Sequence, residues 1–280
     1  MTYEERSRPN VDLPDALDKF PEIISRLKGK IPILFLDYDG TLTPIVSNPE
    51  NAVLPDETKK VLQQLAGHIT IALISGRDRH NVKSIVDIPN LIYAGSHGFD
   101  ITGPDGLEKQ HEKGQDVLPE LDEAEQRLTE RLADIAGVQV ERKKYAIAVH
   151  YRNVEKEHVQ QVKTAVTEEV ENHPRLKKGK GKKILELKPD FDWHKGKALL
   201  WLMEELGGES EHLVPIFIGD DITDEDAFKA IQGKGIGILV GAHEEDTTAT
   251  FSLKDVDEVN RFLTQLREYV SGGIMDTAEK

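Results

Sequence analysis

The 280-residue sequence contains no cysteine. Disulfide bridges, thiolate zinc sites and cysteine nucleophiles are therefore excluded together. The sequence also has no run approaching the ~18 consecutive apolar residues that a membrane span needs. Its first residues, 1–10, are polar and lack the apolar core of a secretory signal. These absences predict a soluble, cytoplasmic protein with no membrane partner. The length of 280 residues allows one large domain or two smaller ones.

Positive charge is scarce, because 36 Lys and Arg stand against 51 Asp and Glu, a net charge of −15. This balance argues against a nucleic-acid partner. Residues 175–183 are an exception, with six positive charges in nine residues. No aromatic residues alternate with these charges, so a solvated basic hairpin tip explains most of them better than a nucleic-acid patch does.

Five short apolar runs are continuous rather than alternating, which is typical of strands buried on both faces of a parallel sheet. They span residues 31–36, 69–74, 91–94, 215–218 and 236–240. Stretches with helical spacing lie between them, such as 56–65 and 195–206. This alternation predicts an α/β fold with a doubly wound, mostly parallel sheet.

The pattern changes between residues 106 and 187. Charged helical stretches at 115–135 and 154–171 alternate with strand-like segments at 145–151 and 184–187. We predict that residues 106–187 form an α+β cap domain inserted into a catalytic core of residues 13–105 and 188–271. The insert is expected to cover the carboxyl ends of the core strands.

Charged or hydroxyl-bearing clusters follow three of the core runs, at 37–39, 75–77 and 219–221. Ligands of open α/β sheets bind outside the carboxyl ends of the strands, so these clusters should meet at one site. Asp37 and Asp39 are two apart in extended chain and can point to the same side. Their repulsion calls for a shared proton or a cation between them, and oxygen ligands suit Mg²⁺.

Neighbouring residues extend this site. Gly40 allows the backbone to turn close to a ligand, and Thr41 offers a hydroxyl and an N–H to phosphate oxygens. In the acidic cluster 220–226, Asp220 is the expected metal ligand, while Thr223 and Asp226 are spaced as a helix cap. Lys195 begins a helix, where a cation is unfavourable, which indicates a partner carboxylate or phosphate.

Motifs of several other enzyme classes are absent from the sequence. No Gly-Lys pair is followed by Ser or Thr, and neither Gly-x-Ser-x-Gly, His-Glu-x-x-His nor Gly-x-Gly-x-x-Gly occurs. Nucleotide motors, esterases, zinc metalloproteases and dehydrogenases therefore lose their usual sequence support.

The order of the remaining motifs resembles the haloacid dehalogenase (HAD) superfamily of aspartyl phosphohydrolases. Its four motifs match Asp37-x-Asp39-Gly40-Thr41, Ser75, Lys195 and Gly219-Asp220-Asp221-x-x-Asp224. Within the superfamily, the chain resembles the trehalose-6-phosphate phosphatases over nearly its whole length. The segments that carry this closer likeness are 75–77, 95–98, 181–186, 193–199 and 219–228.

The resemblance implies a role for each matching residue. Asp37 is the nucleophile that forms an aspartyl-phosphate, Asp39 is the general acid and base, and Ser75 and Lys195 neutralise phosphoryl charge. Asp224 orients Lys195 or a metal-bound water. The expected Mg²⁺ ligands are Asp37, the Asp39 carbonyl, Asp220 and Asp221. The expected substrate-binding residues are Thr41, Gly76, Arg77, His97, Lys182 and Glu186, although the residues themselves favour Arg77 as a structural partner of the helix that follows it.

The implied reaction is the hydrolysis of trehalose 6-phosphate by a protein more consistent with a monomer than an oligomer. Its partner is a small-molecule sugar phosphate. One alternative is another sugar-phosphate phosphatase of the superfamily, of the sucrose phosphate or mannosylglycerate phosphate type, which only the cap would distinguish. The other is a non-catalytic sugar-phosphate sensor. Against a sensor, a pure binder would not need the nucleophile Asp37 beside the acid Asp39.

Overall fold

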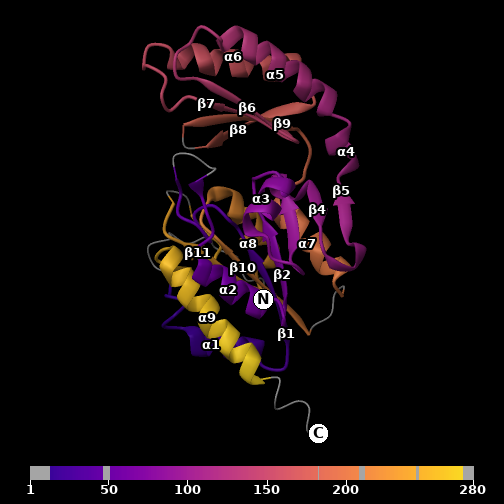
Figure 1. Cartoon of the computed structure of the whole chain (residues 1–280), viewed down its shortest axis with the longest axis vertical. Coiled ribbons are helices and arrows are strands. Elements are labelled where there is room, and N and C mark those ends of the chain that lie inside the picture. Colours follow the sequence, from indigo (N-terminus) through magenta and orange to yellow (C-terminus); the bar gives the residue numbers. More distant parts are fainter. Residues whose placement is uncertain (1–12, 47–50, 182, 208–211, 244–245, 274–280) are drawn as a thin grey trace, which may run out of the picture. The chain divides into compact units, whose positions relative to one another are not determined.

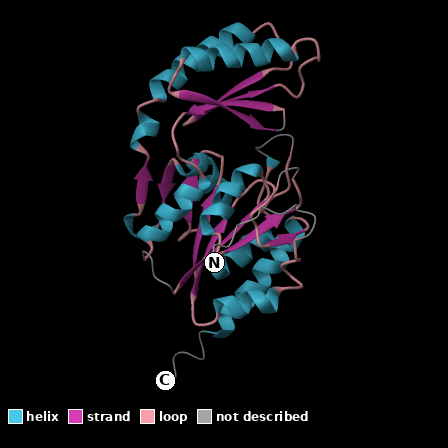
Figure 2. Ribbon diagram, turned by 180° about the vertical axis from the view of Figure 1, so that it is seen from behind, coloured by secondary structure: helices cyan, strands magenta, loops and turns pink. Residues whose placement is uncertain are grey.

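The computed structural model describes residues 13–46, 51–181, 183–207, 212–243 and 246–273 (Figures 1 and 2). These residues fall into two compact units, one from the described residues up to 108 and from 193 onward, and the other from the described residues between 109 and 192. The boundary expected at residue 187 would cut strand β9 (Ile184–Pro189), which pairs along its length inside the second unit. Strand pairing therefore moves the end of the insert beyond residue 187.

The first unit, here called the core, is built on a sheet of order β12-β11-β10-β1-β2-β3-β4-β5. Neighbours from β12 to β3 pair in parallel, and β4 is antiparallel to β3. The strands are β1 (Ile31–Leu36), β2 (Thr70–Ile74), β3 (Ile92–Gly95), β4 (Asp100–Thr102), β5 (Glu108–Gln110), β10 (Leu213–Gly219), β11 (Ile236–Val240) and β12 (Phe251–Leu253). The predicted doubly wound α/β core is confirmed, with β1 between β10 and β2.

Helices cover both faces of the core sheet (Figure 1). Alternate residues of β1 belong to different apolar clusters, Leu34 and Leu36 to one and Ile33 and Phe35 to the other. One face packs against α1 (Phe20–Leu27), α2 (Asp56–Leu65), α3 (Arg79–Val86) and α9 (Val256–Gly273), and the other against α7 (Lys195–Glu205) and α8 (Glu225–Ile231). Burial on both sides explains why the strand sequences are continuously apolar.

The second unit, here called the insert, is an antiparallel sheet of order β6-β7-β9-β8 with helices on one face (Figure 2). The remaining elements are β6 (Gln139–Lys143), β7 (Ala146–His150), β8 (Leu176–Gly181), α4 (Glu112–Gln115), α5 (Leu118–Leu132) and α6 (Val159–Asn172). Ile147, Leu185 and Leu187 pack with α5 and α6. Because side chains alternate along a strand, Glu186 lies on the opposite face.

Among the described residues, no helix combines the length and apolarity that crossing a membrane requires.

Candidate active site at the carboxyl ends of the core strands

A buried acidic group forms where β1 and β10 end. Leu36 lies opposite Ile218 in the parallel pair, so Asp37 and Asp220 follow from neighbouring strand ends. Carboxylate oxygens of Asp37, Asp220 and Asp224 all lie within 4.8 Å of one another. The structure thus brings together three of the predicted site residues.

Lys195 joins this group from the first position of α7. Its Nζ donates to Asp37 Oδ1 at 2.7 Å and to Asp224 Oδ1 at 2.6 Å. The lysine is only 3% exposed. The two carboxylates explain how a cation is kept at a helix start, as its position in the sequence indicated.

The carboxylates carry more negative charge than Lys195 balances. Burial raises the pKa of Asp37 to about 7, with Lys195 opposing this shift and Asp224 adding to it. Burial, together with the negative Asp37, raises the pKa of Asp220 to about 9. Burial also raises the pKa of Asp224 against the effect of Lys195. Crowded carboxylate oxygens with one ammonium fit a divalent cation that prefers oxygen ligands.

Gly40 and Thr41 shape the position of Asp220. Gly40 has a φ of +87°, and a Cβ at this position would lie 2.0 Å from Asp220 Oδ2. The Thr41 hydroxyl, which is fully buried, donates to Asp220 Oδ1 at 3.3 Å. Thr41 was expected to contact phosphate; in the structure its hydroxyl orients a candidate metal ligand.

Asp221 and Asp224 cap the short turn η5 (Ile222–Asp224). Asp224 Oδ2 accepts from the backbone N–H groups of Asp220 and Asp221, and Asp221 Oδ1 accepts from Ile222 N. The expected cap by Thr223 and Asp226 is wrong, because a 3₁₀ turn precedes the helix and its capping residue is Asp221, two residues before Thr223. Asp221 is exposed and is not in the acidic group, whereas Asp224 is in it and also contacts Lys195.

Asp39 points to Arg77 instead of joining the acidic group. Arg77 Nε and Nη2 donate to the two oxygens of Asp39, each at 2.6 Å. Arg77 Nη1 also donates to Asn81 Oδ1 in α3 at 3.1 Å, so the pairing with the following helix is present as well. The pairing with Asp39 was not predicted. Its signal is opposite charge at the ends of the adjacent strands β1 and β2.

Ser75 and His97 lie in two loops that are joined by backbone hydrogen bonds. Ser96 N donates to Arg77 O and His97 N donates to Ser75 O, while Arg77 N donates to Ser75 Oγ at 3.1 Å. Ser96 and His97 have positive φ angles of 50° and 57°. A Cβ on Gly76 would approach His97 Cε1 to 2.9 Å, so the imidazole packs directly against Gly76. Such rare backbone conformations concentrate at functional sites.

The predicted sugar-binding residues belong to the insert. Glu186 on β9 is half-buried, and Lys143 Nζ on β6 lies 3.3 Å from its Oε1. Sequence reasoning missed Lys143, because β6 is too charged to read as a strand. Lys182 lies outside the described residues.

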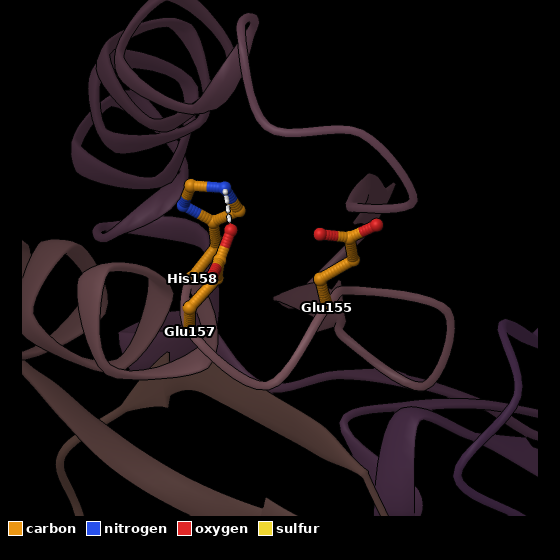
Figure 3. Close-up of side chains that lie close together, drawn as sticks. All are labelled: Glu155, Glu157 and His158. Carbon is orange, nitrogen blue, oxygen red and sulfur yellow. Dashed lines mark ion pairs between the residues drawn. The ribbon is translucent and has the colours of Figure 1, made fainter.

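Two further features of the insert contain none of the predicted site residues. Glu155, Glu157 and His158 lie close together (Figure 3), but all three are exposed, and exposed acidic groups are common without a metal. A hollow of about 630 Å³ lies beside α6 and is lined in part by Tyr151, Lys163 and Lys178.

Comparison with known proteins gives one consistent family. The trehalose-phosphatase family model matches residues 35–257. A "Probable trehalose-phosphate phosphatase D" of Arabidopsis thaliana is 42% identical over 91% of this chain and 72% of its own length. A "Probable trehalose-phosphate phosphatase 2" of Oryza sativa subsp. japonica is 41% identical over 92% of this chain and 74% of its own.

The fold comparison agrees. The structure of the C. albicans trehalose-6-phosphate phosphatase C-terminal domain superposes with a TM-score of 0.74. It covers 92% of this chain and 99% of that domain, at 23% identity, and so supports the fold.

Proposed function

The chain belongs to the trehalose-phosphatase family, and from this membership we propose that it hydrolyses trehalose 6-phosphate to trehalose and inorganic phosphate. The single observation that carries the proposal within the site is the buried contact of Lys195 with Asp37 and Asp224. This contact holds the carboxylate of Asp37, the proposed nucleophile, at the carboxyl ends of the core strands, where ligands of such sheets bind.

In the proposed mechanism, Asp37 attacks phosphorus and the bond from phosphorus to the sugar oxygen breaks. Asp39 gives its proton to that oxygen, and trehalose leaves an aspartyl-phosphate behind. Asp39 then takes a proton from water, which attacks phosphorus and releases inorganic phosphate. Asp37 is regenerated as a carboxylate.

Lys195 and Ser75 would serve the phosphoryl group. The Lys195 ammonium, fixed between two carboxylates, supplies positive charge beside the nucleophile. Ser75 Oγ already accepts from Arg77 N, which leaves its hydroxyl hydrogen to donate to a phosphate oxygen.

Asp37, Asp220 and Asp224 would hold a divalent cation, and we propose Mg²⁺ because the donors are carboxylate oxygens. When bound, it would offset the repulsion between the nucleophile and the phosphate dianion.

Sugar selection is proposed to reside in the insert, where Glu186 and Lys143 offer an acceptor and a donor for hydroxyl groups. A monomeric enzyme of the cytoplasm that acts on a small sugar phosphate, without nucleic acid, stays our expectation.

The test is phosphate release from a panel containing trehalose 6-phosphate, sucrose 6-phosphate and mannosylglycerate phosphate, with and without Mg²⁺. We expect trehalose 6-phosphate to give the highest kcat/KM, and only with Mg²⁺. An Asp37→Asn protein purified in parallel controls for contaminating phosphatases. Preference for another member of the panel would contradict the proposed substrate.

A further inference from the structure

The backbone N–H of Arg77 donates to Ser75, which is proposed to serve the phosphoryl group, and its guanidinium donates to Asp39, which is proposed to transfer protons. We propose that Arg77 is the positioning residue of Asp39, orienting its carboxylate for proton transfer rather than binding the phosphate. This inference rests on the acid and base role proposed for Asp39.

The contact between the two side chains is a fork. Nε and Nη2 of Arg77 each donate to a different oxygen of Asp39, and both distances are 2.6 Å. Two parallel charge-assisted hydrogen bonds fix the plane of a carboxylate as well as its position. A lysine could supply the charge but not this planar geometry.

The two partners differ in burial in the direction that the proposal requires. The Arg77 side chain is 10% exposed, and that of Asp39 is 40% exposed. Arg77 is therefore the fixed support, and Asp39 is the partner that a substrate can reach.

Arg77 is itself held on several sides. Its guanidinium carbon lies 5.2 Å from the centre of the Tyr38 ring, and Nη1 donates to Asn81. Tyr38 is buried and its hydroxyl donates to Ala52 O at 2.7 Å. The Arg77 carbonyl accepts from Ser96 N. A side chain anchored by its backbone, an aromatic face and an amide can hold Asp39 in one orientation.

The same contacts weigh against a phosphate-binding role. The guanidinium edge formed by Nε and Nη2, which would grip a phosphate, is taken by Asp39, and Nη1 is engaged by Asn81. Contact of this edge with the transferred group would require both fork bonds to break. Direct substrate binding by Arg77, the expectation from the sequence, is the rival that the experiment must distinguish from a role exerted through Asp39.

A double-mutant cycle tests this role. The variants are Arg77→Met, Arg77→Lys, Asp39→Asn and Asp39→Asn with Arg77→Met, each assayed on trehalose 6-phosphate and on p-nitrophenyl phosphate. Acid catalysis matters most for the sugar, a poor leaving group, and least for nitrophenolate. We expect Arg77→Met to lower kcat on trehalose 6-phosphate by about 10- to 100-fold, with KM little changed. We expect Arg77→Lys to recover part of the loss.

Two readouts separate the proposal from its rivals. If Arg77 acts through Asp39, Arg77→Met causes no further loss in the Asp39→Asn background. The first-turnover release of nitrophenolate, which needs no acid, should change little, whereas hydrolysis of the aspartyl-phosphate, for which Asp39 is the base, should slow for both substrates. A rise in KM for both substrates that persists in that background would show phosphate binding instead and overturn the inference. Wild-type activity of Asp39→Asn would overturn the proposed mechanism, whereas an impaired Asp39→Asn with an unimpaired Arg77→Met overturns the inference alone.

Folding is checked by the thermal midpoint of each variant. Should Arg77→Met fail to fold, Asn81→Ala loosens Arg77 while keeping its charge. We expect a smaller loss on the sugar phosphate that also disappears in the Asp39→Asn background. An Asn81→Ala loss that persists in the Asp39→Asn background would contradict the positioning role.

Discussion

Lys195 shares its ammonium between two buried carboxylates, Asp37 and Asp224. Removing Lys195 would leave its two buried carboxylate partners uncompensated, and removing a carboxylate side chain would leave a buried ammonium hydrogen without its acceptor. A variant that tests the chemistry must therefore keep the shape of the group. An amide in place of Asp37 meets this condition, since its oxygen can still accept from Lys195.

We expect Asp37→Asn to fold and to lower turnover of trehalose 6-phosphate by about 10³-fold or more, because an amide cannot form the covalent intermediate. Steady-state kinetics and the thermal midpoint check both parts. Near-native turnover in a preparation free of other phosphatases would show that Asp37 is not the nucleophile.

Gly40 offers a second test at the residue scale. Its φ is +87°, and an added Cβ would lie 2.0 Å from Asp220 Oδ2, so Gly40→Ala should displace Asp220. Gly233 is the matched control, with a φ of +74° and nothing within 4 Å of an added Cβ.

We expect both variants to lose about 1 kcal/mol of folding free energy to the backbone strain, and only Gly40→Ala to lose activity and weaken Mg²⁺ binding. Denaturation and Mg²⁺ titration of activity check this. Equal activity of the two proteins would show that Gly40 does not set the position of Asp220.

At the scale of elements, a helix or strand could be predicted where its local sequence pattern agrees with its burial, but not where pairing with a neighbouring strand is what stabilises it. The apolar run 31–36 coincides with β1, and the helical spacing of 56–65 coincides with α2, because local pattern and burial agree there. The strands β6 and β8 were not predicted. Their sequences, QVERK and LKKGKG, are charged and are held as strands by pairing with β7 and β9.

The candidate site also contains some contacts that could be predicted from the sequence and others that could not. The meeting of Asp37, Asp220 and Lys195 could be predicted, because strand order and motif order bring them to one edge of the sheet. For the fork between Arg77 and Asp39, the sequence offers only the signal of opposite charge at two neighbouring strand ends, since the geometry of the contact depends on side-chain rotamers. The cap formed by Asp221 and Asp224 was missed because a 3₁₀ turn precedes α8.

The position of Glu186 on strand β9 leads to a prediction about sugar binding. Leu185 and Leu187 pack under the helices of the insert, while Glu186 lies on the other face beside Lys143. We expect Glu186→Ala to lower kcat/KM for trehalose 6-phosphate by about 5- to 150-fold, as an unpaired sugar hydroxyl costs about 1–3 kcal/mol. Parallel assays on p-nitrophenyl phosphate, which has no sugar, should show a much smaller change.

Glu171, an exposed glutamate on α6, is the matched control for Glu186, and Glu171→Ala should leave the hydrolysis of both substrates unchanged. Equal losses on both substrates in Glu186→Ala would mean that Glu186 supports the fold, and the sugar-reading role would be abandoned.

At the scale of the whole molecule, the net charge is unevenly distributed. The insert, residues 109–192, carries 17 Lys and Arg and 17 Asp and Glu, so the net charge of −15 belongs to the remainder of the chain. Each unit also has its own apolar clusters. The acidic group therefore adds its repulsion to a unit that is already negative, which ties the stability of the core to pH and to cations.

The sign of this dependence follows from the raised pKa values of Asp37, about 7, and Asp220, about 9, against 3.8 for an ordinary aspartate. Between these limits the folded state binds more protons than the unfolded state, so the free energy of unfolding should fall as pH rises from about 4 to about 9. A divalent cation that takes the place of those protons should stabilise the fold increasingly as pH rises.

We therefore expect denaturation curves in chelator to shift to lower denaturant between pH 5 and pH 9, and Mg²⁺ to suppress most of that shift. Asp220→Asn should be more stable than the wild type in chelator at pH 9, because one buried charge is gone, and should gain little from Mg²⁺. Asp134→Asn, at an exposed position of the insert, should behave as the wild type. If the curves with and without Mg²⁺ stayed parallel across this pH range, the acidic group would not be the cation site.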